Sequence, residues 1–253
     1  MIVSRNVNGF MNKPRRQGRI MKLIVTGAGK GLGQEIVGEA LRRGHEVAAG
    51  IRSLETNVET LEALQEGVPG KLTLLELDVD EEESVAQAKE AMAERWGTVD
   101  ALINNAGILL AREQSIERLE FAAVENTFRT NLYGPMKMVK HFLPLLKAGN
   151  RPLILNVSSE AGCLAGAYGG DYPYALSKAA LNYFTAQLRK ELVPQGFAVY
   201  AMHPGWMRTP MGGSQAPGDP RDSARSILDL AEGKLEADTN AVMIGIDGKA
   251  MPL

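Results

Sequence analysis

The sequence predicts a single doubly wound α/β domain, in which helices cover both faces of a seven-stranded, mostly parallel sheet. From Lys22 onward, short apolar runs alternate with amphipathic stretches, as strands and helices do in such folds. Most runs lack polar alternation, which is typical of strands that are buried on both faces. No repeat, linker or low-complexity stretch divides the 253 residues, so we expect one domain.

The predicted strands are short and end in turn residues; they are Leu23–Thr26, Glu46–Ala49, Leu72–Leu75, Ala101–Asn104, Leu153–Val157, Ala198–Met202 and Val242–Ile244. Helical spacing is found in Gln34–Arg43, Glu82–Glu94 and Ala175–Leu192. In sheets of this kind, ligands bind outside the carboxyl ends of the strands, where the strand order reverses. Motifs that directly follow a strand are therefore the ones to inspect for function.

The first twenty residues differ from the rest because they are basic, contain no acidic residue and have little apolar periodicity. Three interpretations compete: a disordered arm, a targeting peptide, or upstream sequence included through a misassigned start. We favour the last, because Met21 directly precedes the first strand. We expect residues 1–20 to carry no function and residues 21–253 to form the functional domain.

Composition excludes several classes of function. A net charge of −2 gives no reason to expect a nucleic-acid or membrane-surface partner. No apolar run approaches the ~20 residues that span a bilayer. Cys163 is the single cysteine, so we expect no intrachain disulfide, a reducing compartment and a cytoplasmic location. No metal site is expected.

A glycine-rich turn, Thr26–Gly33, follows the first strand and opens a helix. Gly27 permits a tight turn, Gly31 lets the backbone approach a pyrophosphate, and Gly33 lets the helix pack closely on the sheet. The free N–H groups at the helix start then face the anion. The turn predicts a Rossmann-type dinucleotide site with the contacts Gly27, Lys30, Gly31, Leu32 and Gly33.

The end of the second strand bears on the choice between NADP(H) and NAD(H). An acidic residue there commonly binds both ribose hydroxyls of NAD, whereas an arginine accommodates the 2′-phosphate of NADP. Here the chain has Arg52 and no acid, and Lys30 adds a second cation. We therefore expect NADP(H) to be preferred, with NAD(H) as the alternative.

Further motifs follow the other strands in order: Asp78-Val79, Asn104-Asn105-Ala106-Gly107, Asn131, Ser158-Ser159, Tyr174-x-x-x-Lys178 and Pro204-Gly205 with Thr209. Together with the Gly-x-x-x-Gly-x-Gly spacing, they resemble the short-chain dehydrogenase/reductase family over essentially all of residues 21–253. Finer features, such as Ser177–Asn182 and His203–Trp206, are similar to the subgroup of C-signal and sniffer-type carbonyl reductases.

The resemblance implies roles for these residues. Asp78 and Val79 would bind the adenine edge, and Asn105, Ala106 and Gly107 would line the cofactor cleft. The turn containing Pro204, Gly205 and Thr209 would hold the nicotinamide carboxamide. The catalytic set would be Asn131, Ser159, Tyr174 and Lys178, with Tyr174 and Lys178 also holding the ribose hydroxyls.

Two details of the catalytic set are specific to this chain. Ser159 is chosen over Ser158 because the family usually uses the second residue of this pair, although 15 positions separate it from Tyr174, about two more than is common. Pro135 lies four residues after Asn131 and has no N–H. It therefore frees the carbonyl of residue 131, which would hold a water that passes protons to Tyr174.

The chemistry suits a hydride-transfer enzyme. Tyr174 and Lys178 lie four apart on one helix face. We expect the ammonium to lower the phenol pKa from its ordinary value of ~10. Tyr174 would protonate a carbonyl oxygen as hydride arrives from NADPH, and Ser159 would stabilise the developing charge.

The predicted function is therefore an oxidoreductase acting on a small-molecule carbonyl or secondary alcohol. The alternatives are an NADP(H)-binding regulatory or signalling protein with little turnover, and a lyase or epimerase on the same fold. Residues 205–224, rich in Gly, Pro and Met, would form a substrate lid with Trp206 and Met207 as apolar walls, beside Tyr168 and Tyr172. Family resemblance implies a homodimer or homotetramer.

Overall fold

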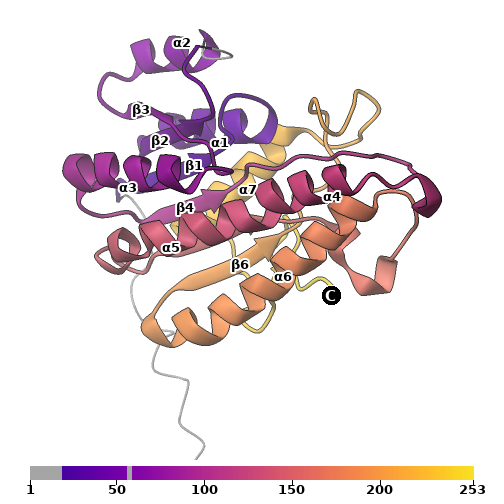
Figure 1. Cartoon of the computed structure of the whole chain (residues 1–253). Helices are drawn as coiled ribbons and strands as arrows, with labels where there is room; N and C mark the ends of the chain where they lie inside the picture. The colour runs from indigo at the N-terminus through magenta and orange to yellow at the C-terminus, as the bar shows by residue number, and fades with distance from the viewer. Residues whose placement is uncertain (1–18, 56–58) are drawn as a thin grey trace, which may run out of the picture.

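The computed structural model describes residues 19–55 and 59–253, and its seven strands form one sheet in the order β3-β2-β1-β4-β5-β6-β7 (Figure 1). Every neighbouring pair is parallel. The strands are β1 Lys22–Thr26, β2 Glu46–Ile51, β3 Leu72–Glu76, β4 Ala101–Asn104, β5 Leu153–Val157, β6 Ala198–Met202 and β7 Met243–Ile244. The predicted doubly wound sheet is confirmed, and the strand order reverses between β1 and β4.

Helices cover both faces of the sheet. They are α1 Gly31–Arg42, α2 Glu59–Gly67, α3 Glu82–Trp96, α4 Phe121–Phe128, α5 Gly134–Lys147, α6 Tyr172–Leu192 and α7 Pro220–Glu232. In Figure 1, α5 and α6 lie in front of the sheet and α7 lies behind it. Successive side chains of β1 point to opposite faces of the sheet and so pack in two separate cores. Leu23 packs with α1 and α7, whereas Ile24 packs with α3 and α5. Each large side chain so buried contributes about 1.5–3 kcal/mol.

The helical segment around Asn131 is not regular. A π-helical turn, Arg129–Tyr133, separates α4 from α5. Pro135 is the second residue of α5 and has no N–H to donate to the carbonyl of Asn131. The α-helical hydrogen-bond pattern is therefore interrupted at Asn131. Such π-helical turns often occur near functional sites.

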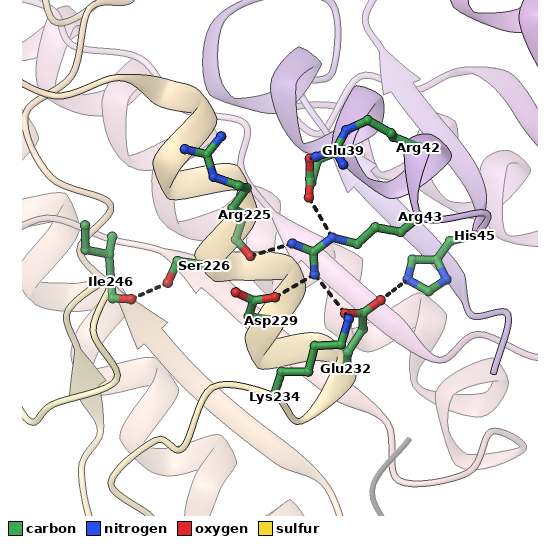
Figure 2. A network of polar contacts seen from close by, with 10 residues as sticks. All are labelled: Glu39, Arg42, Arg43, His45, Arg225, Ser226, Asp229, Glu232, Lys234 and Ile246. Atoms are coloured by element: carbon green, nitrogen blue, oxygen red, sulfur yellow. Dashed lines mark hydrogen bonds and ion pairs between the residues drawn. The ribbon is translucent and has the colours of Figure 1, made fainter. Parts of the chain in front are cut away.

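A polar network joins α1 to α7 (Figure 2). The Arg43 guanidinium donates to Glu39 Oε1 at 2.6 Å, to Asp229 Oδ1 at 2.7 Å and to Glu232 Oε2 at 2.8 Å. His45 Nε2 lies 2.9 Å from Glu232 Oε1. The network lies toward the C-terminal ends of α1 and α7, away from the glycine-rich turn that precedes α1, so it joins the two helices at the edge of the sheet opposite the turn.

Most of the predicted N-terminal extension, residues 1–18, lies outside the described residues. Arg19 is described, and its Nη2 lies 3.1 Å from Asp100 Oδ1. Among residues 19–55 and 59–253, no helix has the length and apolarity needed to cross a bilayer. The same residues contain no cluster of three or more His, Cys, Asp or Glu side chains suited to a metal ion.

Candidate active site

A cavity of about 890 Å³ opens at the carboxyl ends of the strands. It lies where the strand order reverses between β1 and β4, the position expected for a ligand in this fold. Every site residue predicted from the sequence lines it except Gly33 and Asn131. The lining residues from that prediction are Gly27, Lys30, Gly31, Leu32, Arg52, Asp78, Val79, Asn105, Ala106, Gly107, Ser159, Tyr174, Lys178, Pro204, Gly205 and Thr209.

The glycine-rich turn leaves no room for side chains beneath it. Gly27 has a φ of +64°, and a Cβ there would lie 2.8 Å from the Cα of Ala106. A Cβ on Gly33 would lie 2.3 Å from the carbonyl oxygen of Gly27. Gly33 does not line the cavity, but its lack of a side chain lets α1 pack closely on the turn. The start of α1 at Gly31 lines the cavity.

The turn after β4 is fastened to the end of β1. Thr26 Oγ1 accepts hydrogen bonds from the N–H groups of Asn105 and Ala106, both at 3.0 Å. Asn105 Nδ2 donates to the carbonyl oxygens of Thr26 and Gly27, at 2.9 and 3.1 Å. These four bonds hold the two central loops at the switch point in one arrangement.

Arg52 lies just beyond β2 and lines the cavity, as do Lys30 and Asp78. Its Nε lies 3.5 Å from Asp78 Oδ2, and its Nη2 lies 3.9 Å from Asp80 Oδ2. The Arg52 side chain is 65% exposed, so these long ion pairs contribute little to stability. The guanidinium can therefore turn to an anionic ligand at small cost.

Tyr174 lies in the first turn of α6, and its hydroxyl interacts with Ser159. Burial raises the phenol pKa above its ordinary value of 10.0; the hydrogen bond with Ser159 and the charge of Arg112 oppose that rise, whereas Asp171 adds to it. The neighbouring Ser158 hydroxyl instead donates to Asn182 Oδ1 at 2.6 Å. Of the two serines, only Ser159 is thus positioned to act with Tyr174.

Lys178 is 4% exposed, and its Nζ donates to the carbonyl oxygen of Val157 at 2.8 Å. The same nitrogen lies 5.5 Å from the centroid of the Tyr174 ring. Burial lowers the Lys178 pKa to about 8. The expectation that Lys178 would lower the Tyr174 pKa is not met in this structure, since Ser159 and Arg112 are the groups that lower it.

Asn131 lies behind the cavity and is fully buried. Its Oδ1 accepts from the N–H of Ile108 at 2.8 Å, while Nδ2 donates to the Ile108 carbonyl at 2.9 Å and to Ser177 Oγ at 3.0 Å. A Cβ on Gly107 would lie 3.4 Å from Asn131 Oδ1 and 3.7 Å from Lys178 Nζ. The Asn131 side chain therefore positions the β4 loop next to Lys178.

Several charged residues of the cavity carried no signal in the sequence. They come from separate loops at the strand ends, and only folding brings them together: Arg112, Glu113, Glu160 and Asp171. His203, from the motif His203–Trp206, lines the cavity beside them. His203 Nδ1 accepts from the N–H of Glu160 at 3.3 Å. Burial lowers the pKa of the His203 imidazole. Of the four predicted walls, Trp206, Met207 and Tyr168 line the cavity and Tyr172 does not.

The segment after β6 is internally bonded. Met207 pairs with Gly218 in a parallel bridge, and Trp206 Nε1 donates to the Gly212 carbonyl at 2.8 Å. Arg208 Nη1 donates to the Ala216 and Pro217 carbonyls. Residues 220–224, which we placed in the lid, belong instead to α7, because Pro220 suits a first helical position and Asp219 caps the helix.

Comparison with known proteins agrees with this geometry. Residues 22–219 match the family model described as short chain dehydrogenase. The chain is 31% identical over 251 residues to the 3-oxoacyl-[acyl-carrier-protein] reductase FabG of Thermotoga maritima, covering 92% of this chain and 98% of the relative. It is 38% identical over 138 residues to the C-signal protein of Myxococcus xanthus, covering 54% of this chain and 82% of that protein.

Solved structures show the same likeness. The carbonyl reductase Sniffer of Drosophila melanogaster superimposes with a TM-score of 0.85 at 28% identity, over 93% of this chain and 100% of that chain. An NADPH-bound carbonyl reductase from chicken fatty liver gives the same TM-score, identity and coverage. The matching family model, the full-length relatives and the shared fold lead to one conclusion. The chain belongs to the short-chain dehydrogenase family.

Proposed function

We propose that this protein is an NADP(H)-dependent oxidoreductase that interconverts a carbonyl compound and a secondary alcohol, with Tyr174 as the general acid and base. The observation that carries the proposal is the convergence of Tyr174, Ser159 and Lys178 on one cavity that also holds the glycine-rich turn. Relatives described as reductases, and a structural neighbour described as an NADPH-bound carbonyl reductase, support the same reaction class.

The cavity fits a dinucleotide. The glycine-rich turn presents backbone without side chains, because a Cβ at Gly27 or Gly33 would collide with main-chain atoms. The start of α1 faces this turn and favours a pyrophosphate there. Arg52 and Lys30 both line the cavity and would supply positive charge for a 2′-phosphate. These residues support NADP(H) as the preferred cofactor; NAD(H) remains the alternative that binding measurements decide.

When bound, a nicotinamide would supply or accept the hydride. The protein residues then provide the proton and stabilise the developing charge. Because burial raises the pKa of Tyr174, its hydroxyl is protonated at neutral pH and can donate that proton to a carbonyl oxygen. Ser159 donates a hydrogen bond to the same oxygen as negative charge develops. Lys178 supplies positive charge close to the Tyr174 ring, and Asn131 holds the loop after β4 in place through Ile108.

The test is NADPH oxidation with a panel of aldehydes and ketones, followed by absorbance. Tyr174→Phe is expected to lower turnover by about 10²–10⁴-fold, since it removes the proton donor. Tyr172→Phe is the matched control, because Tyr172 lies two residues earlier, outside the cavity lining. Tight NADPH binding with no turnover of any carbonyl compound would instead support the regulatory alternative.

The proposal includes a homo-oligomer. Large apolar side chains are exposed on the helices of one layer: Leu176 and Tyr183 on α6 are 54% and 69% exposed, and Met136 on α5 is 42% exposed. Leu176 and Tyr183 are seven residues apart and therefore share one face of α6. A second copy of this chain would cover them. Light scattering on the purified protein tests this, and Tyr183→Glu is expected to yield monomers.

A further inference from the structure

Arg112 lies at the candidate active site, in the loop between β4 and α4. It lines the same cavity as Tyr174 and Ser159, and its positive charge lowers the pKa of the Tyr174 phenol. Its Nη2 donates to the carbonyl oxygen of Met211 in the segment after β6, at 3.2 Å. The guanidinium thus acts on the proton donor through its charge and is hydrogen-bonded to the segment after β6.

The backbone on both sides of Arg112 is held in an unfavourable conformation. Ala111 has a φ of +52° and Glu113 a φ of +60°, the left-handed region that costs a side-chain-bearing residue about 1–3 kcal/mol. Contacts at the start of α6 hold this turn: the Glu113 N–H donates to Asp171 Oδ1 at 3.0 Å, and Gly170 packs against the Glu113 Cα. The turn directs Arg112 into the cavity.

Arg112 retains most of its hydrogen-bonding capacity. A guanidinium has five N–H donors in a planar fork suited to carboxylates. In the described part of the chain, its hydrogen bond to Met211 is its one polar contact, and no carboxylate forms an ion pair with it. Asp171, an acidic side chain that lines the same cavity, already accepts from the Glu113 N–H and from the Tyr168 hydroxyl. Both of its oxygens are therefore occupied by uncharged donors.

We propose that Arg112 is a substrate-binding residue that holds a carboxylate of the substrate, so that the preferred substrates are carbonyl compounds bearing a carboxylate group. This inference rests on the proposed function. A carboxylate bound at Arg112 fixes the carbonyl group next to Tyr174 and Ser159, because all three residues line one cavity. The bound carboxylate would also lie near the segment after β6, since Arg112 donates to the Met211 carbonyl oxygen of that segment.

The first experiment compares 4-carboxybenzaldehyde with its methyl ester, methyl 4-formylbenzoate, which has a similar shape and no charge. For the wild type, we expect kcat/KM with NADPH to be about ten- to a hundredfold higher for the acid, the ratio expected from a charge-assisted hydrogen bond. Arg112→Met should bring that ratio close to one, mainly through KM for the acid, and Arg112→Lys should restore part of it. Arg118→Met, outside the cavity lining, is the control and should leave the ratio unchanged.

Equal kcat/KM values for the two aldehydes in the wild type would overturn the inference. So would an Arg112→Met variant that loses activity equally on both, since that pattern indicates a role in the structure of the loop alone. Titration calorimetry with the same two compounds, on protein saturated with NADP⁺, separates this inference from the proposed function. If neither aldehyde is reduced, tighter binding of the acid that depends on Arg112 retains the carboxylate site while the reductase proposal fails; equal binding rejects both.

Discussion

Lys178 Nζ donates a 2.8 Å hydrogen bond to the carbonyl oxygen of Val157, which joins α6 to the end of β5 inside the protein. This lysine is 4% exposed, and burial lowers its pKa from 10.5 to about 8. Between those values the unfolded chain binds more protons at this position than the folded chain does. The free energy of unfolding therefore includes an unfavourable contribution below pH 8, which disappears as the pH rises toward 10.5.

The first prediction follows from this buried charge. Lys178→Met should abolish turnover without lowering the free energy of unfolding at pH 7, and should raise it by up to about 2 kcal/mol. The gain from removing a buried ammonium is partly offset by the unpaired Val157 carbonyl. Urea unfolding at several pH values checks this, because the advantage of the variant should shrink from pH 8 to pH 10. A variant less stable than the wild type at pH 7 would contradict it.

The second prediction concerns His45 and Glu232, between α1 and α7. Burial lowers the His45 pKa more than its contact with Glu232 raises it. The unfolded chain then takes up a proton near pH 6.5 that the folded chain does not, so stability should fall as the pH drops below 6.5. His45→Gln should reduce this dependence. Thermal unfolding from pH 8 to pH 5 measures it, and an identical slope in the variant would reject the assignment.

Glu232→Gln tests the same network by charge. Burial alone would raise the Glu232 pKa, but hydrogen bonds from Lys234, Arg43 and His45 lower it, so the group is ionised and paired at neutral pH. Removing one member of a buried ion pair should cost about 3 kcal/mol. Asp222→Asn, on the exposed side of the same helix, is the control and should cost under about 1 kcal/mol. Denaturant unfolding compares the two.

The third prediction concerns two glycines of α1. Gly33→Ala should impair both folding and NADPH binding, since the added Cβ would lie 2.3 Å from the Gly27 carbonyl oxygen. Gly38→Ala places its Cβ 4.0 Å from Leu64 and should stabilise the protein by about 0.4–1 kcal/mol. Melting temperatures and NADPH titrations distinguish them. Similar behaviour of the two variants would mean that the turn is not closely packed.

The fourth prediction concerns cofactor choice. Arg52→Asp should weaken NADPH binding about ten- to a hundredfold and leave NADH binding nearly unchanged, because only NADPH carries the 2′-phosphate. Arg95→Asp, on α3 and outside the cavity lining, controls for the change in net charge. Fluorescence titration of both cofactors gives the ratio. Equal losses for NADPH and NADH would remove Arg52 from the phosphate site.

The fifth prediction concerns Pro135. An alanine there can donate its N–H to the carbonyl of Asn131, which should regularise the π-helical turn and draw Asn131 away from Ile108. Turnover should fall by about tenfold with an increased solvent isotope effect, equivalent to ~1.4 kcal/mol in the barrier. Pro144→Ala, later in α5, should change neither quantity. An unchanged turnover in Pro135→Ala would mean that the carbonyl of Asn131 has no part in proton delivery.

The sequence by itself determined the sheet and the positions of the main motifs. Strand and helix periodicity are local properties, so the strands around Leu23 and Leu153 were located within one or two residues. The steric need for glycine at 33 is also local, since a Cβ there would meet the Gly27 carbonyl oxygen, as is the pairing of Tyr174 with Lys178 on one helix face. These features follow from residues close together in the chain.

Only the tertiary structure decided the pKa shifts of the site residues and the surroundings of Arg112. Burial sets the pKa of Lys178 and of Tyr174, and burial depends on the packing of distant segments. Arg112 reaches the cavity through a turn that Asp171 holds by accepting from the Glu113 N–H, 58 residues earlier in the chain. Arg112 also donates to the carbonyl oxygen of Met211, in a third segment. No pattern within one segment predicts such contacts, because each of these segments by itself has the composition of an ordinary surface loop.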